Sequence, residues 1–253
     1  MGYRAGAASL SADAVAANAD TGLGNAGTGL ANADIALANA GIGLENAGQG
    51  ADLDAVIDEV AGKMLAGITP RYITRELAIA ISKNTVTFTD PDGTEVMRVE
   101  SADLAANLSG CGLALLYAAT LGESADRLVH RYELLSMLKA SAAQAAGAEI
   151  IESFCDSAVK EIGKQMQPRG LYLKPRFSPG YGDFALEHQR DFFRVLDLER
   201  KLGLHLNGSL LMVPTKSVTA VIGLTANPEA CHISKCAKCD KTDCEFRMVH
   251  DDE

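Results

Sequence analysis

The run Cys111-Gly-Leu-Ala-Leu-Leu-Tyr-Ala-Ala119 decides the fold of this chain. It is a continuous apolar stretch that stops at Thr120-Leu-Gly122. Such a run is typical of a strand that is buried on both faces. It therefore predicts an interior strand of a sheet.

Further strand candidates lie on both sides of this run. Residues 71–81, 85–89 and 95–99 precede it, and the last two are joined by Asp90-Pro-Asp-Gly93, which is typical of a turn between hairpin strands. Residues 209–213 and 217–224 follow it and are separated by a turn at Pro214.

Helical patterns alternate with these strands. Residues 51–67 carry apolar side chains at helical spacing and predict an amphipathic helix. Ser101-Ala-Asp-Leu is typical of the start of a short helix, and a further helix is predicted over 186–202. A long helical stretch covers 124–164, with a break near 129–133 and an Ala-rich second half that packs against the sheet. The order predicts an α+β domain over residues 51–230, with a twisted, mainly antiparallel sheet and packed helices.

Residues 1–50 form a separate segment, which we name the heptad arm. Asn-Ala pairs recur every seven residues between positions 14 and 48, at Asn18, Asn25, Asn32, Asn39 and Asn46, with Leu23, Leu30, Leu37 and Leu44 in step. Leu and Ala alternate along one side of a helix, but eight glycines weaken that helix by up to about 1 kcal/mol each. The arm is either a low-complexity expansion or a helix that docks on a partner or a second copy.

Composition excludes several functional classes. The 253 residues are 47% hydrophobic and carry a net charge of −10, which disfavours nucleic acid and anionic membrane surfaces as partners. We see neither a membrane-spanning stretch nor a signal peptide, and expect a cytoplasmic protein. Six cysteines, four of them near the C-terminus, favour metal or redox chemistry over a disulfide framework.

The stretch Arg176-Phe-Ser-Pro-Gly-Tyr-Gly-Asp183 has the composition of a ligand loop. Arg176 offers a planar, permanently charged fork of donors for a carboxylate or phosphate. Pro179 fixes the backbone, Gly180 lets it approach a ligand closely, and Tyr181 has little bulk beside its ring. The alternative is a plain Gly-Pro turn whose arginine caps a helix or pairs with Asp183.

A second run follows, Met212-Val-Pro-Thr-Lys-Ser-Val-Thr-Ala-Val-Ile-Gly223, and then Cys236-Ala-Lys-Cys239 with Cys244-Glu-Phe-Arg247. Together with the Arg176 loop, Cys111-Gly and Ala119-Thr-Leu-Gly122, these motifs resemble the activation (reactivation) domain of vitamin B12-dependent methionine synthase, in its stand-alone form. The resemblance covers roughly residues 60 to 247 and leaves out the heptad arm.

The resemblance implies an S-adenosylmethionine site. Arg176 would hold the carboxylate of the methionine portion, Ser178 would contact the ligand through its backbone, and Pro179, Gly180 and Tyr181 would shape the pocket. In the family, this domain closes over a cobalamin domain, and an electron from a flavodoxin- or ferredoxin-type donor with a methyl group from S-adenosylmethionine restores methylcobalamin. Catalytic acid–base residues are not required, and none is expected.

Two features limit the transfer. The family also uses an acidic ligand residue, for which Glu149 and Glu152 are candidates, although on an Ala-rich helix both are expected to be solvated. The cobalamin-binding pattern Asp-x-His-x-x-Gly is absent from the sequence. A corrinoid would therefore arrive on a partner, either a methionine synthase or a corrinoid protein.

The tail, residues 231–253, carries Cys231, Cys236, Cys239 and Cys244 within fourteen residues. Four thiolates at this spacing suit tetrahedral zinc or an iron–sulfur cluster, and neighbouring cations favour the thiolate form. Free cysteines without a metal are the third interpretation.

The sequence thus predicts an S-adenosylmethionine-binding accessory protein for reductive methylation of a corrinoid, within methionine biosynthesis. One alternative is a methyltransferase subunit with another acceptor. Another is a non-catalytic sensor or scaffold with a structural metal in the tail.

Overall fold

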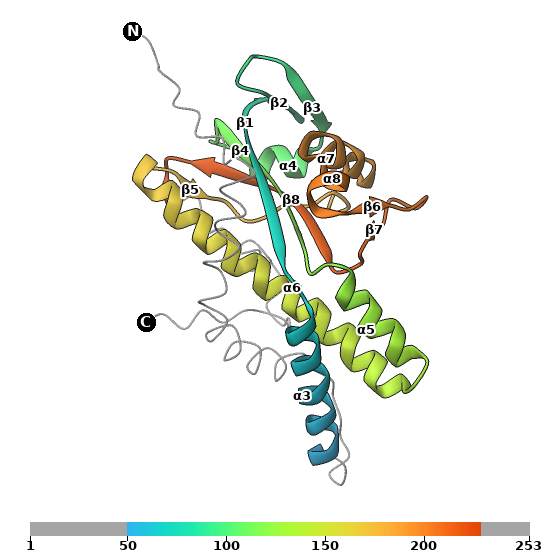
Figure 1. Ribbon diagram of the computed structural model, residues 1–253. Coiled ribbons are helices and arrows are strands. Elements are labelled where there is room, and N and C mark those ends of the chain that lie inside the picture. Colours follow the sequence, from blue (N-terminus) through green and yellow to red (C-terminus); the bar gives the residue numbers. More distant parts are fainter. Residues whose placement is uncertain (1–49, 229–253) are drawn as a thin grey trace, which may run out of the picture.

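The computed structural model describes residues 50–228 (Figure 1). Six strands form one fully antiparallel sheet in the order β3-β2-β1-β4-β8-β5, with helices packed on both faces. The expected α+β class is confirmed. The heptad arm and the cysteine tail lie outside the described residues.

Strand β4 (Leu113–Thr120) is the interior strand that the apolar run predicts. It pairs along its full length with β1 (Arg71–Ser82) on one side and with β8 (Ser217–Thr225) on the other. Leu115 and Tyr117 point into one hydrophobic cluster, and Leu116 points into the other. The run is apolar at every position because both faces of this strand are covered.

Strands β1, β2 (Thr85–Thr89) and β3 (Glu95–Glu100) form a meander at one edge of the sheet. Thr94 N donates to Asp92 Oδ1 in the turn between β2 and β3, and Asp90 N donates to Thr94 O. The register between these two strands shifts at Phe88 and Thr89. The Asp-Pro-Asp-Gly turn and both of its strands are therefore formed as expected.

One face of the sheet is covered by α3 (Gly50–Gly67), α5 (Glu123–Glu133) and α6 (Met137–Met166), which lie together in Figure 1. Small side chains of α6 such as Ala143 and Ala146 are buried and let the helix approach closely. The break in the long helical stretch falls at residues 134–136, a few positions later than expected. Ser136 accepts from Lys139 N and begins α6 as its N-cap.

The opposite face is covered by α4 (Ala102–Asn107), α7 (Gln189–Leu196) and α8 (Leu198–Leu202). The expectation of one helix over 186–202 was wrong. The segment begins with a short turn, η3 (Leu186–His188), and Asp197 separates α7 from α8 with a φ of 56°. This left-handed residue ends one helix and redirects the chain, so that Leu198 and Leu202 reach the core.

Short elements complete the fold. The turn η2 (Gln167–Arg169) ends α6, and β5 (Tyr172–Leu173) pairs with the end of β8. Strands β6 (His205–Leu206) and β7 (Met212–Val213) form a separate two-stranded ladder, so the strand expected at 209–213 is much shorter. Over residues 50–228, no helix has the length and apolar character required to cross a bilayer.

Candidate functional site

The Arg176 loop is attached to strand β8 by backbone hydrogen bonds. Lys174 N donates to Gly223 O at 2.8 Å, and Phe177 and Val221 exchange two bonds, Phe177 N to Val221 O and Val221 N to Phe177 O, at 2.9 and 2.8 Å. Because β8 lies next to the interior strand β4, this attachment fixes where Arg176 leaves the sheet. The loop and the second sequence motif, which supplies β8, are thereby brought together.

The far end of the loop is attached to α4. The Asp183 carboxylate accepts from the Ser101 hydroxyl, from Ala102 N at 2.7 Å and from Asp103 N at 3.2 Å. These donors hold the pKa of Asp183 below its usual value, with the Ser101 bond as the largest cause. The alternative in which Asp183 pairs with Arg176 is therefore wrong, because this carboxylate caps a helix.

Gly182 is required at this attachment. Its φ is +55°, and a Cβ atom there would lie 2.1 Å from Asp103 Oδ2. The Asp183 amide in turn donates to Asp103 Oδ2 at 3.2 Å. A side chain at Gly182 would thus strain the backbone and displace the start of α4.

Arg176 points to α6 on the face of the sheet opposite α4. Its Nη2 atom lies 2.9 Å from Glu152 Oε2 and 2.7 Å from Asp156 Oδ1. The arginine side chain is only 19% exposed, whereas the two carboxylates are 57% and 76% exposed. Burial opposes the charge on Arg176, but the acidic neighbours, including the Cys155 thiol, outweigh it and raise its pKa.

Of the two acidic candidates from the sequence, Glu152 forms an ion pair with Arg176, whereas we expected it to be solvated. Glu149, one turn earlier, shows no hydrogen bond or ion pair to Arg176. Sequence reasoning missed Asp156, although its spacing of four residues from Glu152 places both on one side of a helix.

Below Arg176, Cys155 and Tyr117 fill the core between α6 and the sheet. Both are fully buried, and burial raises the pKa of each side chain. The Tyr117 hydroxyl lies beside the Cys155 thiol and has no well-formed hydrogen bond within residues 50–228. Tyr72 stacks on Tyr117 with ring centroids 6.0 Å apart, so the floor under Arg176 is buried and partly aromatic.

The remaining loop residues form a tight turn. Tyr181 N donates to Ser178 O at 3.2 Å, and Gly180 N donates to Phe184 O at 2.7 Å, with Gly180 at a φ of +95°. Pro179 is buried, whereas Tyr181 is 60% exposed. The turn therefore presents an aromatic ring to the surroundings from a fixed backbone.

The second motif is fastened beside α5 and α6. The Val213–Pro214 bond is cis, and both the amide and the hydroxyl of Thr215 donate to the Asp126 carboxylate at 2.8 and 2.7 Å. Lys216 Nζ donates to the backbone and side-chain oxygens of Gln144 at 3.1 and 2.8 Å. Burial lowers the pKa of Lys216.

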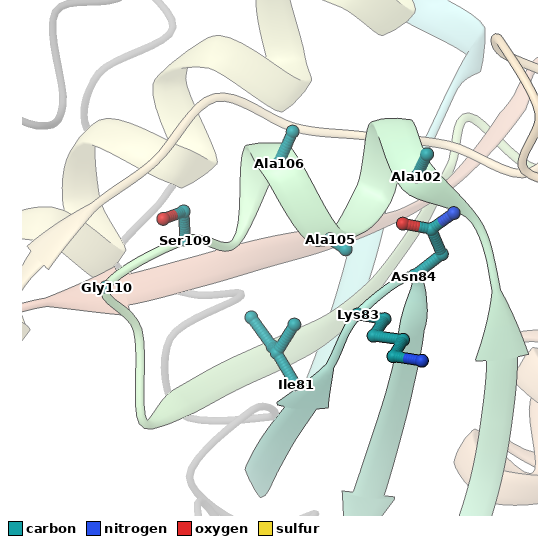
Figure 2. Close-up of a pocket in the computed structure, with 8 residues that line it drawn as sticks. All are labelled: Ile81, Lys83, Asn84, Ala102, Ala105, Ala106, Ser109 and Gly110. Carbon is teal, nitrogen blue, oxygen red and sulfur yellow. The ribbon is translucent and has the colours of Figure 1, made fainter.

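A separate hollow of about 410 Å³ lies on the α4 face, as Figure 2 shows. Lys83 is the charged residue in its lining, and no residue of the Arg176 loop takes part. The hollow is lined by Ile81 at the end of β1, by Lys83 and Asn84 of the β1–β2 turn, and by Ala102, Ala106 and Ser109 from α4 and the turn after it. It therefore does not bring the predicted ligand residues together.

The four tail cysteines of the predicted metal site lie beyond the described residues. Between residues 50 and 228, no three His, Cys, Asp or Glu side chains are grouped as metal ligands. The zinc and iron–sulfur interpretations of the tail stay predictions.

Comparison with known proteins identifies a structural neighbour for this arrangement. A crystal structure of the MetH reactivation domain bound to AdoHcy superimposes with a TM-score of 0.55 at 15% sequence identity, over 71% of this chain and 67% of that chain. No family model matches the sequence, and no curated protein matches it. The chain therefore shares the fold of a methionine synthase reactivation domain at a distance.

Proposed function

We propose that this protein binds S-adenosylmethionine at the Arg176 loop and supports reductive remethylation of a corrinoid carried by a partner. The observation that carries the proposal is the placement of Arg176 between Glu152 and Asp156, in a loop that also exposes Tyr181. The structural neighbour was crystallised with AdoHcy, the demethylated form of this ligand, which agrees with the proposal.

The charges at the site fit an amino acid group. The guanidinium of Arg176 can donate hydrogen bonds to the α-carboxylate of the ligand, while Glu152 and Asp156 can accept from its α-ammonium group. The two carboxylates are largely exposed and so remain accessible, and they also favour the positive sulfonium. Tyr181 offers a ring face for the adenine.

When bound, S-adenosylmethionine supplies an electrophilic methyl group. The residues of this chain would bind and orient the ligand, with Arg176 lying over the buried side chains of Tyr117 and Cys155. The acceptor would be a corrinoid on a methionine synthase or corrinoid protein, and the electron would come from a flavodoxin or ferredoxin. The four tail cysteines would hold zinc or an iron–sulfur cluster.

Calorimetry with S-adenosylmethionine tests ligand binding. We expect saturable binding to the full chain, weakened about ten- to a hundred-fold by Arg176→Gln, because a charge-assisted bond is lost. Arg169→Gln is the matched control, since Arg169 also pairs with a carboxylate, that of Glu76, but lies outside the loop. No binding to the wild type, or equal binding to both variants, would overturn the proposal.

A second assay tests the reaction. Cob(II)alamin-loaded methionine synthase, a reductant and S-adenosylmethionine are mixed with or without the protein, and methylcobalamin is followed by its absorption. Formation that depends on this protein and is lost in Arg176→Gln supports the role in reactivation. If the protein binds S-adenosylmethionine but methylcobalamin formation does not depend on the protein, the methyl acceptor is another molecule.

A further inference from the structure

The turn between α5 and α6 exposes a compact apolar surface. Within residues 50–228, eight large apolar side chains are exposed, and four of them belong to this one turn. Their exposures lie between 51% and 76%. We name this group the helical tip; it consists of Leu134, Leu135, Met137 and Leu138. Contiguous exposed apolar residues of this kind mark a contact surface.

The helical tip is separate from the proposed ligand site. Both sites involve α6, but Leu138 lies 14 residues before Glu152, which corresponds to about 21 Å along a helix. A small ligand bound at the Arg176 loop therefore does not cover the apolar tip.

Helix α3 directs the N-terminal segment toward this tip. Glu59 of α3 accepts from Lys139 Nζ of α6 at 2.8 Å, and five residues later Met64 lies against Gly147 of α6. The two helices thus run in the same direction, and the first residues of α3 lie at the end of α6 that carries the tip (Figure 1). The heptad arm joins α3 at this end.

We propose that the heptad arm of the same chain covers the helical tip, with Leu37 and Leu44 seated on it. Gly50 lies six positions after Leu44, and an extended chain of that length spans about 20 Å. An arm tethered so close competes for the tip at an effective concentration of about millimolar, which disfavours a second copy. The glycines of the arm make an isolated helix marginal, so its Leu seam needs such a surface.

Charge supports the same occupant. The arm carries one basic residue, Arg4, and four acidic ones: Asp13, Asp20, Asp34 and Glu45. Arg131 is exposed on the last turn of α5, beside the tip, whereas the carboxylate of Glu133 on the same turn lies 3.1 Å from His130 Nδ1. Glu45 follows Leu44 directly, so a leucine on the tip brings a carboxylate toward this arginine.

Photo-cross-linking of the full chain tests the proposal. We place p-benzoyl-phenylalanine at Leu135, illuminate an equal mixture of 15N-labelled and unlabelled protein, and map the products by mass spectrometry. We expect cross-links from position 135 to residues 30–48 of the same chain. The same probe at Lys160, an exposed residue near the other end of α6, should not reach the arm.

A variant identifies the contact. Leu44→Asp should lower the cross-linking yield at position 135 about ten-fold, because a buried leucine is replaced by a charge. Asn46→Asp introduces the same charge two residues away and should keep the yield within about two-fold of the parent protein, because surface substitutions have small effects. Cross-links only between two copies would assign the tip to a dimer and overturn the proposal, as would no cross-link to the arm.

Discussion

The Asp183 carboxylate accepts a hydrogen bond from the Ser101 hydroxyl, which lies 82 positions earlier in the chain. Ser101 is itself the N-cap of α4, since its hydroxyl accepts from Leu104 N at 2.9 Å. A single carboxylate thus joins the end of the Arg176 loop to a helix on the opposite face of the sheet from Arg176. The shape of the Arg176 loop therefore depends on helices on both faces of the sheet.

This link predicts the effect of Asp183→Ala. Because donors from Ser101 to Asp103 lose their acceptor, we expect the melting temperature to fall by about 2–8 °C. We also expect weaker binding of S-adenosylmethionine, because the Pro-Gly-Tyr turn loses its attachment. Differential scanning fluorimetry and calorimetry check the two effects. Asp191→Ala removes only local contacts with His188 and Arg194 and should be nearly neutral.

Two glycines of α6 should respond differently to alanine. Nothing lies within 4 Å of a Cβ atom at Gly163, so Gly163→Ala should raise the free energy of unfolding by about 0.5–1 kcal/mol. A Cβ atom at Gly147 would lie 2.9 Å from Lys216 Cε and 3.2 Å from Met64 Sδ. Gly147→Ala should therefore be less stable than Gly163→Ala by about 1 kcal/mol or more. Urea unfolding measures both, and equal stabilisation would contradict the close packing.

Most of the fold could be predicted from the sequence, because it depends on local patterns. Periodicity and turn chemistry are sufficient to predict the first and last residues of β2, the Asp-Pro-Asp-Gly turn, the Ser101 cap of α4 and the strand β4, which is buried on both faces. The break at Asp197 could not be predicted, since neither Gly nor Pro marks this position and the residue after it, Leu198, is buried in the core. Strand 209–213 shortened because it pairs only with the two residues of β6.

The candidate site was predictable only in part. The loop composition singled out Arg176 and Tyr181, but the partners of Arg176 and Asp183 come from elements that are distant in sequence. Asp156 lies 20 residues before Arg176, and Ser101 lies 82 residues before Asp183. Such pairs depend on how α6 and α4 pack on the sheet, which no local pattern of this chain specifies.

The ion pairs of Glu59 predict a pH dependence of stability. Hydrogen bonds from Lys139 and Lys63 lower its pKa from 4.5 to about 2. The folded state therefore binds this proton less readily than the unfolded chain, so the stabilisation is complete above pH 4.5 and is lost as the pH falls toward 2. Glu59→Gln should show a shallower loss of stability over this window. Chemical unfolding at several pH values tests it, and 1 M salt should reduce the difference.

The pairing of Arg176 with Glu152 and Asp156 predicts how the protein distinguishes two ligands. S-adenosylmethionine carries an α-carboxylate, whereas decarboxylated S-adenosylmethionine keeps the amine, the sulfonium and the adenosine. If Arg176 contacts the carboxylate, Arg176→Gln should weaken binding of the first ligand about ten- to a hundred-fold and leave the second within about two-fold. Tyr181→Ala should weaken both equally, because the aromatic contact is common to them. Equal losses for both ligands in Arg176→Gln would contradict a contact with the carboxylate. They would mean that Arg176 shapes the loop through its ion pairs with Glu152 and Asp156 of α6, because the substitution breaks these pairs whichever ligand is added.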